Sequence, residues 1–156
     1  MNYEMLEAKL NQADEETQNG NYDEAEHLAN EVLAELDSFH FEEGRDGVLS
    51  RALLTLGNVS RMRGNFPAAL EHYASALGAT ENANDISGIA KAMTEFGNVY
   101  VKLGSYDKAL EYYGKALALL EELGEKSSIA RVTGNIGIVY CLLALTTRHW
   151  NTTVKL

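Results

Sequence analysis

The chain has 156 residues, of which 46% are hydrophobic and 23% are charged, a composition ordinary for one globular unit. Its formal net charge of -10 argues against binding to nucleic acid, which requires a basic surface. One cysteine and one proline, with no stretch rich in Ser, Gly or Pro, exclude an internal disulfide framework and give no support for a flexible linker.

Two features of the sequence, its amino terminus and the length of its apolar runs, bear on where the protein resides. The amino terminus shows neither the basic nor the apolar region of a secretion signal. No apolar run approaches the length of a membrane span. We therefore expect a cytoplasmic protein that makes no contact with a membrane.

The first predicted element is a helical hairpin over residues 6–40. Its two helices meet at Gly20, which is followed by the capping residue Asn21 and by Tyr22, and Ala25 comes three residues after the aromatic side chain. Glycine tolerates the left-handed conformation past a helix end, and asparagine is a good amino-terminal cap. These residues predict a tight turn between two antiparallel helices.

A second hairpin is predicted over residues 50–83. Apolar side chains return at helical spacing until Gly64 ends the first helix. Asn65 then caps the second helix, and Pro67 falls in its first turn, where a missing amide is harmless. Gly57 lies mid-helix, where glycine costs about 1 kcal/mol relative to alanine. Its recurrence later in the chain indicates that a close approach of the two helices offsets this cost.

A third hairpin over residues 90–124 repeats the second almost residue for residue. Its first helix contains Gly97 and ends at Gly104, its second helix opens at Ser105, and Gly124 is its expected stop. These positions fall 40 residues after their counterparts, whereas the first copy precedes the second by 44. A fixed period of this length predicts a stack of repeats.

A fourth copy begins over residues 130–145 but is incomplete. It contains Ile136-Gly137-x2-Tyr140, yet no glycine turn follows, and residues 146–156 are an atypical tail. Either this tail folds back as an irregular cap over the last helix, or the helix stays unpaired and binds a partner or a second copy. We favour a homodimer through the carboxy-terminal helix, because a large apolar face is rarely left bare. The predicted contacts are Leu142, Leu143 and Trp150.

These phased residues resemble the tetratricopeptide repeat, whose signature runs large apolar-x2-Leu-Gly-x2-Tyr and then Ala-x3-aromatic. The matching segments are Leu53-x2-Leu56-Gly57-x2-Ser60 with Ala69-x3-Tyr73, and Met93-x2-Phe96-Gly97-x2-Tyr100 with Ala109-x3-Tyr113. The longer period is similar to that of kinesin light chains, spindle-orientation adaptors and bacterial sensor and signalling proteins. The resemblance implies an all-α fold over residues 1–156, a right-handed α-solenoid of antiparallel helix pairs with about three and a half repeats.

In this family the first helix of each pair lines a concave groove in which peptides lie. Carrying these positions over selects polar residues that recur at or near the repeat interval. The resulting groove residues are Arg51, Asn58, Arg61, Lys91, Asn98, Lys102, Arg131 and Asn135. An asparagine amide both donates to and accepts from a peptide backbone, and arginine and lysine neutralise carboxylates. Each of these residues alone is explained as solvated surface paired with neighbours such as Glu95, but the phased row favours a groove for an extended acidic or carboxylate-bearing peptide.

The sequence gives no sign of catalysis, and we expect no metal or cofactor. No two of the four histidines have the i, i+4 spacing of a helical metal site, and no nucleophile stands beside a base. Our first hypothesis is a scaffold that binds a protein or peptide partner in a signalling or regulatory complex. The alternatives are a sensory segment of a larger enzyme, such as a nucleotide cyclase or kinase, and a dimerising structural spacer without a ligand.

Overall fold

The structure, a computed structural model, describes residues 3–38 and 43–154 of the chain, with side chains as far as Arg148. The described residues form seven α-helices and contain no strand. Their bounds are α1 Tyr3–Asn19, α2 Tyr22–Asp37, α3 Arg45–Met62, α4 Phe66–Asn82, α5 Ile86–Lys102, α6 Tyr106–Leu123 and α7 Lys126–Val154.

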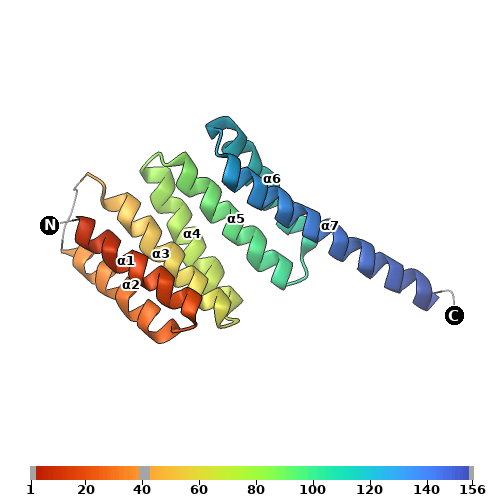
Figure 1. Cartoon of the computed structure of the whole chain (residues 1–156), viewed down its shortest axis with the longest axis horizontal. Coiled ribbons are helices and arrows are strands. Elements are labelled where there is room, and N and C mark those ends of the chain that lie inside the picture. Colours follow the sequence, from red (N-terminus) through yellow and green to blue (C-terminus); the bar gives the residue numbers. More distant parts are fainter. Residues whose placement is uncertain (1–2, 39–42, 155–156) are drawn as a thin grey trace.

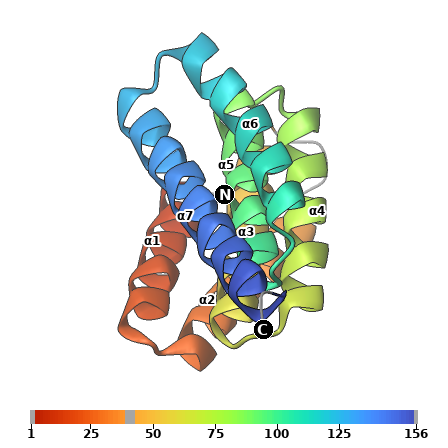
Figure 2. The ribbon, with the colours of Figure 1, turned by 90° about the vertical axis from the view of Figure 1, so that its right-hand side faces the viewer.

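The helices form antiparallel pairs that stack side by side into an array (Figure 1). Helices α1 and α2, α3 and α4, and α5 and α6 make three hairpins, and each hairpin packs against the next. Helix α7 packs chiefly against α6 and lies across that end of the array (Figure 2). This arrangement confirms the predicted all-α solenoid of helix pairs.

The glycine turns lie where the sequence predicted them. Gly64 has φ of 79° and Gly104 has φ of 74°, a left-handed conformation that other residues rarely adopt. The Asn65 side chain accepts a hydrogen bond from the backbone amide of Ala68, as expected of a cap. Ser105 makes no such bond, so the turn before α6 depends on its glycine.

Tyrosine rings explain the two glycines in the middle of α3 and α5. A methyl group on Gly57 would lie 2.4 Å from Cε1 of Tyr73, and one on Gly97 would lie 2.4 Å from Cε1 of Tyr113. Both tyrosines are almost completely buried. The expected close approach within each pair is therefore present twice, and it requires the absence of a side chain.

Helix α7 decides between the two alternatives for the end of the chain, because as far as Val154 the last helix continues and does not fold back as an irregular cap. The helix runs without a break to Val154. Ala144 stands where the repeat pattern has its turn glycine, and alanine favours a helix more than any other residue. The uninterrupted helix leaves the fourth pair without a second helix in the described part of the chain.

The same helix also qualifies the expectation about membranes. Over Lys126–Arg148 it is long and apolar enough to cross a bilayer by length and composition alone, which is weak evidence of a span. Val132 and Val139 in this stretch are fully buried in the hydrophobic core formed with α6, whereas Ile138 and Tyr140 are exposed. One face of α7 thus belongs to the protein core, and another is uncovered.

Candidate peptide-binding groove

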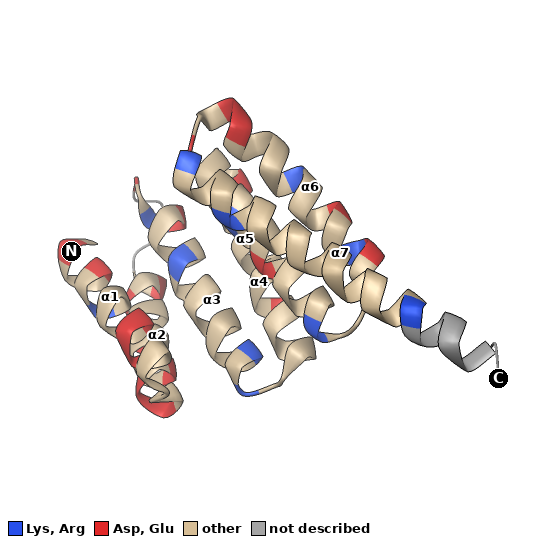
Figure 3. Cartoon of the chain, turned by 45° about the vertical axis from the view of Figure 1, so that its right-hand side comes forward, with Lys and Arg blue, Asp and Glu red and all other residues tan. Residues whose placement is uncertain are grey.

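The first helices of the pairs, α1, α3, α5 and α7, follow one another along one side of the array (Figure 3). Helix α3 packs against both α1 and α5, and the Asn135 amide on α7 donates to the Asn98 side chain on α5 at 3.3 Å. Residues one repeat apart therefore occupy equivalent positions on neighbouring helices.

Two adjoining cavities open on this side. The first encloses about 190 Å³ and is lined by Asp14, Arg51, Leu54, Thr55, Asn58, Lys91, Glu95 and Arg131. The second encloses about 350 Å³ and is lined by Arg61, Asn98, Val101, Lys102, Tyr113, Arg131, Asn135 and Ile138. Arg131 borders both cavities, which we call together the groove. All eight residues predicted for the groove line it.

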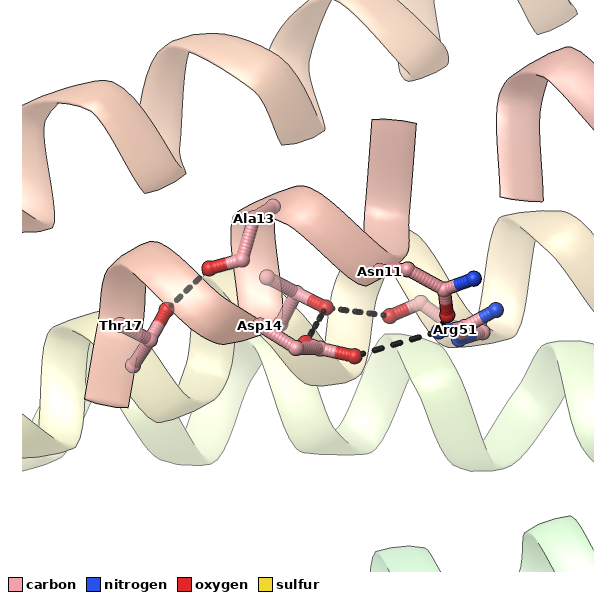
Figure 4. Close-up of polar contacts among 6 residues, drawn as sticks. Asn11, Ala13, Asp14, Thr17 and Arg51 are labelled. Carbon is pink, nitrogen blue, oxygen red and sulfur yellow. Dashed lines mark hydrogen bonds and ion pairs between the residues drawn. The ribbon is translucent and has the colours of Figure 1, made fainter. Parts of the chain in front are cut away.

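The cationic residues of the groove differ in how much charge they offer to a ligand. Arg51 is neutralised by the first hairpin. Its guanidinium lies 3.3 Å from a carboxylate oxygen of Asp14 and also donates to the side chain of Asn11 (Figure 4). The Thr55 hydroxyl donates to the same carboxylate at 2.8 Å. Arg51 therefore closes the α1 end of the groove and has little charge left to attract a ligand.

Arg61 is also paired, inside a network in the middle of the groove. Its Nε lies 3.7 Å from a carboxylate oxygen of Glu95, to which Asn98 also donates. Burial opposes the charge of Arg61, but the Tyr73 hydroxyl and the Glu95 carboxylate outweigh burial and raise the pKa of the guanidinium. Burial and the Glu95 charge raise the pKa of Tyr113 to about 12. Arg61 is thus a permanently charged part of the groove wall.

Three further cations remain available to a ligand. Lys91, Lys102 and Arg131 are exposed and make no ion pair with any residue that the structure describes. The groove contains five cationic side chains and two carboxylates, a surplus of three positive charges. It is a cationic site on a chain of net charge -10.

Of the two carboxylates in the groove, Glu95 is anticipated as a partner of the basic residues, whereas Asp14 is not, although the sequence holds a signal for it. Asp14 lies 44 residues before Asn58, the same interval that separates the first two turn glycines. Glu95 stands at the same position of its repeat as Thr55 and Asn135, which lie 40 residues before and after it. Applied to the first copy, the interval of 44 residues places Asp14 at the same repeat position as Asn58.

Of the predicted oligomer contacts, the two whose side chains the structure describes are both partly covered by the protein itself. Leu143 packs against the hydrophobic core formed with α6, and Leu142 is half-buried. The side chain of Trp150 lies outside the described residues. Exposed apolar side chains of α7 are instead Ile138, Tyr140 and Leu145.

No metal centre accompanies the groove in the described part of the chain, where no three His, Cys, Asp or Glu side chains gather closely enough to hold an ion. What the groove offers to a ligand is positive charge and amide groups. Both serve recognition of carboxylates and peptide backbone.

Comparison with known families agrees with the fold and its repeats. Two models of the tetratricopeptide repeat match the chain, one over residues 10–84 and the other over residues 88–145. The chain belongs to the tetratricopeptide repeat family. No curated protein matches it in sequence.

Solved structures with this fold include several repeat proteins of low sequence identity. BtubC from P. vanneervenii aligns with a TM-score of 0.70 and 22% identity over 82% of this chain and 51% of its own. RapI, in its apo form, aligns with a TM-score of 0.75 and 17% identity over 97% of this chain and 40% of its own. The tetratricopeptide repeat array described here thus spans about half the length of BtubC and less of RapI.

A shorter similar structure is PcrH from Pseudomonas aeruginosa. It aligns with a TM-score of 0.66 and 18% identity over 90% of this chain and 95% of its own. PcrH has also been solved in complex with the chaperone binding region of PopB. At this level of identity the likeness to the present chain is one of fold.

Proposed function

We propose that this tetratricopeptide repeat array is a scaffold whose groove binds an extended peptide bearing acidic side chains or a terminal carboxylate. The observation that carries the proposal is the convergence of Lys91, Lys102 and Arg131, all without a described ion-pair partner, in one groove of an acidic protein. Such charges attract carboxylates and repel other basic segments.

The geometry suits an extended ligand. Lys91 on α5 and Arg131 on α7 line the same cavity, so the two cations face one short stretch of a ligand. In an extended peptide, alternate side chains point the same way at a spacing of about 7 Å. Lys91 on α5 and Arg131 on α7 can therefore each meet a carboxylate of the same strand. Asn135 lines the same cavity as Arg131 and supplies an amide for the peptide backbone, whereas the Asn98 amide already bonds to Tyr113, Glu95 and Asn135.

The complex of PcrH with a region of PopB supports a peptide or protein as the ligand, because a protein of the same fold has been solved with one. We extend this to the present chain as a cytoplasmic component of a signalling or regulatory complex. Homodimerisation is a separate prediction, and the properties of the groove do not support it.

The experiment is a fluorescence anisotropy titration with a labelled glutamate-rich peptide, compared with the same peptide in which glutamine replaces glutamate. We expect the acidic peptide to bind and the neutral one to bind much more weakly. The double variant Lys91→Gln/Arg131→Gln should weaken binding by at least about tenfold, or 1.4 kcal/mol. Arg51 is left unchanged, because its replacement would leave Asp14 without its cationic partner.

The matched control is Lys108→Gln/Lys126→Gln, which removes the same charge from positions that do not line the groove. Binding should be nearly unchanged in this control, apart from a small loss of long-range attraction. Equal weakening in the two double variants would show that the peptide responds to net charge alone, and the proposal would then be wrong. Equal binding of the acidic and neutral peptides would also contradict it.

A further inference from the structure

Helix α7 contains a docking position that no described residue fills. Gly137 is the counterpart of Gly57 and Gly97, on which the rings of Tyr73 and Tyr113 lie. A methyl group on Gly137 would have nothing within 4 Å. The hole that receives an aromatic ring in the second and third pairs is therefore open in the fourth.

The surface around Gly137 forms one uncharged face of α7. Small exposed residues recur along it every three or four positions, which places them in one stripe: Ala130, Gly134, Gly137, Cys141 and Ala144. Three large apolar side chains flank the stripe, namely Ile138, Tyr140 and Leu145, which are 57%, 60% and 61% exposed. No charged residue occurs between Arg131 and Arg148. We call this surface the α7 face.

We propose that the α7 face docks on the α7 face of a second copy of this chain. The two helices run antiparallel about a two-fold axis near Ile138, so that Tyr140 of each copy covers Gly137 of the other. Such a contact is isologous, because each copy supplies the same knob and the same hole. Small residues along a helix permit the close approach that this contact requires.

The distribution of charge favours a second copy as the occupant. Residues 1–38 contain eleven Asp and Glu but one Lys, a net charge of -10, whereas the remaining twelve acidic and twelve basic residues cancel. The whole net charge therefore resides in the first hairpin, at the opposite end of the array from α7 (Figures 1 and 3). Two copies joined through α7 keep their acidic hairpins far apart, where salt screens the repulsion.

The residue next to the open hole argues against another helix of the α4 or α6 kind. The Tyr73 hydroxyl donates to Asn58 at 2.6 Å, and the Tyr113 hydroxyl donates to Asn98 at 2.7 Å. Ile138 occupies the equivalent position in α7 and has no side-chain acceptor. A tyrosine buried in the same way would lose its hydrogen bond, whereas the proposed pairing sets Ile138 against Ile138 and leaves the Tyr140 hydroxyl at the solvent-facing rim of the contact.

The pairing would also affect the groove, because Ile138 lines its second cavity as well as the α7 face. A second copy would therefore extend the wall of the groove at its α7 end. The proposed dimer depends on the residues of the α7 face and not on which peptide the groove binds.

Light scattering over a series of concentrations tests the pairing. We expect the unmodified chain to be a dimer and Gly137→Glu to be a monomer or to dimerise at least about tenfold more weakly. The matched control is Gly114→Glu, at an exposed helical glycine on α6 that also has nothing within 4 Å. It adds the same charge and should leave the dimer intact. A chain that stays monomeric to millimolar concentration, or a dimer that persists in Gly137→Glu, would overturn the proposal.

A cross-linking experiment tests the register. In a Cys141→Ala background, Ile138→Cys should form an intermolecular disulfide on mild oxidation, because the two-fold axis brings this position close to itself. Gly114→Cys in the same background should not. A dimer without the cross-link at position 138 would contradict the antiparallel register. Sedimentation of monomeric protein with lipid vesicles would assign the α7 face to a membrane and overturn the proposal.

Discussion

Two contacts between glycine and tyrosine fix the separation of the helices within the second and third pairs. The Tyr73 ring lies on Gly57 and the Tyr113 ring lies on Gly97, and each hydroxyl donates to the asparagine that follows the glycine. The small residue, the ring and the amide thus act as one unit. The sequence predicts the close approach but not the hydrogen bond, because the repeat pattern does not indicate which side chain each asparagine amide meets.

The first prediction concerns Gly97→Ala. The new methyl group would lie 2.4 Å from the Tyr113 ring, and overpacking of this kind costs about 1–3 kcal/mol, against a gain of about 1 kcal/mol in helix propensity. We expect a lower free energy of unfolding in urea. Gly114→Ala is the control and should gain stability, because its methyl group meets open space. Equal stability of the two variants would show that the ring does not need the glycine.

The second prediction concerns Tyr113→Phe and alkaline pH. The variant loses the hydrogen bond to Asn98 and should be less stable by about 1 kcal/mol at neutral pH. The pKa of Tyr113 is raised to about 12 by burial and the Glu95 charge, above about 10 in the unfolded chain. Ionisation therefore favours the unfolded chain, and the stability of the unmodified protein falls as pH rises from 10 through 12.

The variant lacks this ionisable group, so its disadvantage should shrink over the same pH range. Urea unfolding of both proteins at several pH values measures the difference. A disadvantage that stays constant from pH 7 to 12 would contradict the burial of the Tyr113 hydroxyl in a network with Glu95.

At the scale of the helices, glycine turns were easier to predict than caps and starting residues. The structure begins α3 at Arg45 and α5 at Ile86, whereas the hairpins were expected from residues 50 and 90. The residues before these starting points carry no Gly-x-aromatic turn of the kind that marks the second helices. Asp85 caps α5 by accepting from the Gly88 amide at 3.0 Å, a role the repeat pattern did not indicate.

The third prediction compares two helix caps. Asp85→Ala removes a side chain that satisfies a free backbone amide, and it should cost about 1 kcal/mol of stability. Ser105→Ala removes a side chain that makes no capping bond, and it should change stability little. Thermal unfolding followed by circular dichroism measures both. A larger loss for Ser105→Ala than for Asp85→Ala would show that the caps have been assigned wrongly.

At the scale of the whole molecule, the repeat period carried most of what could be predicted. It placed Arg51, Lys91 and Arg131 in one row, and all three line one cavity. It did not reveal that Asp14 neutralises Arg51, because an ion pair between hairpins depends on where two side chains meet in space. The repeat pattern shows that no glycine turn follows Tyr140, but it leaves open whether the chain then folds back or continues as helix, and the structure shows a helix to Val154.

The distribution of charge gives the array two different ends. The first hairpin carries the net negative charge, the groove carries a positive surplus, and α7 presents an uncharged face. A ligand with negative charge is therefore directed away from α1 and α2 and toward α5 and α7. Binding should be tighter at low salt for this reason.

The most direct test of the groove is amide chemical-shift mapping during titration with the glutamate-rich peptide. We expect the shifts to concentrate on α5 and α7 around Lys91, Asn98 and Arg131, with small effects on α2 and α4. Shifts confined to the outer helices α2, α4 and α6, with α5 and α7 unchanged at saturation, would contradict it.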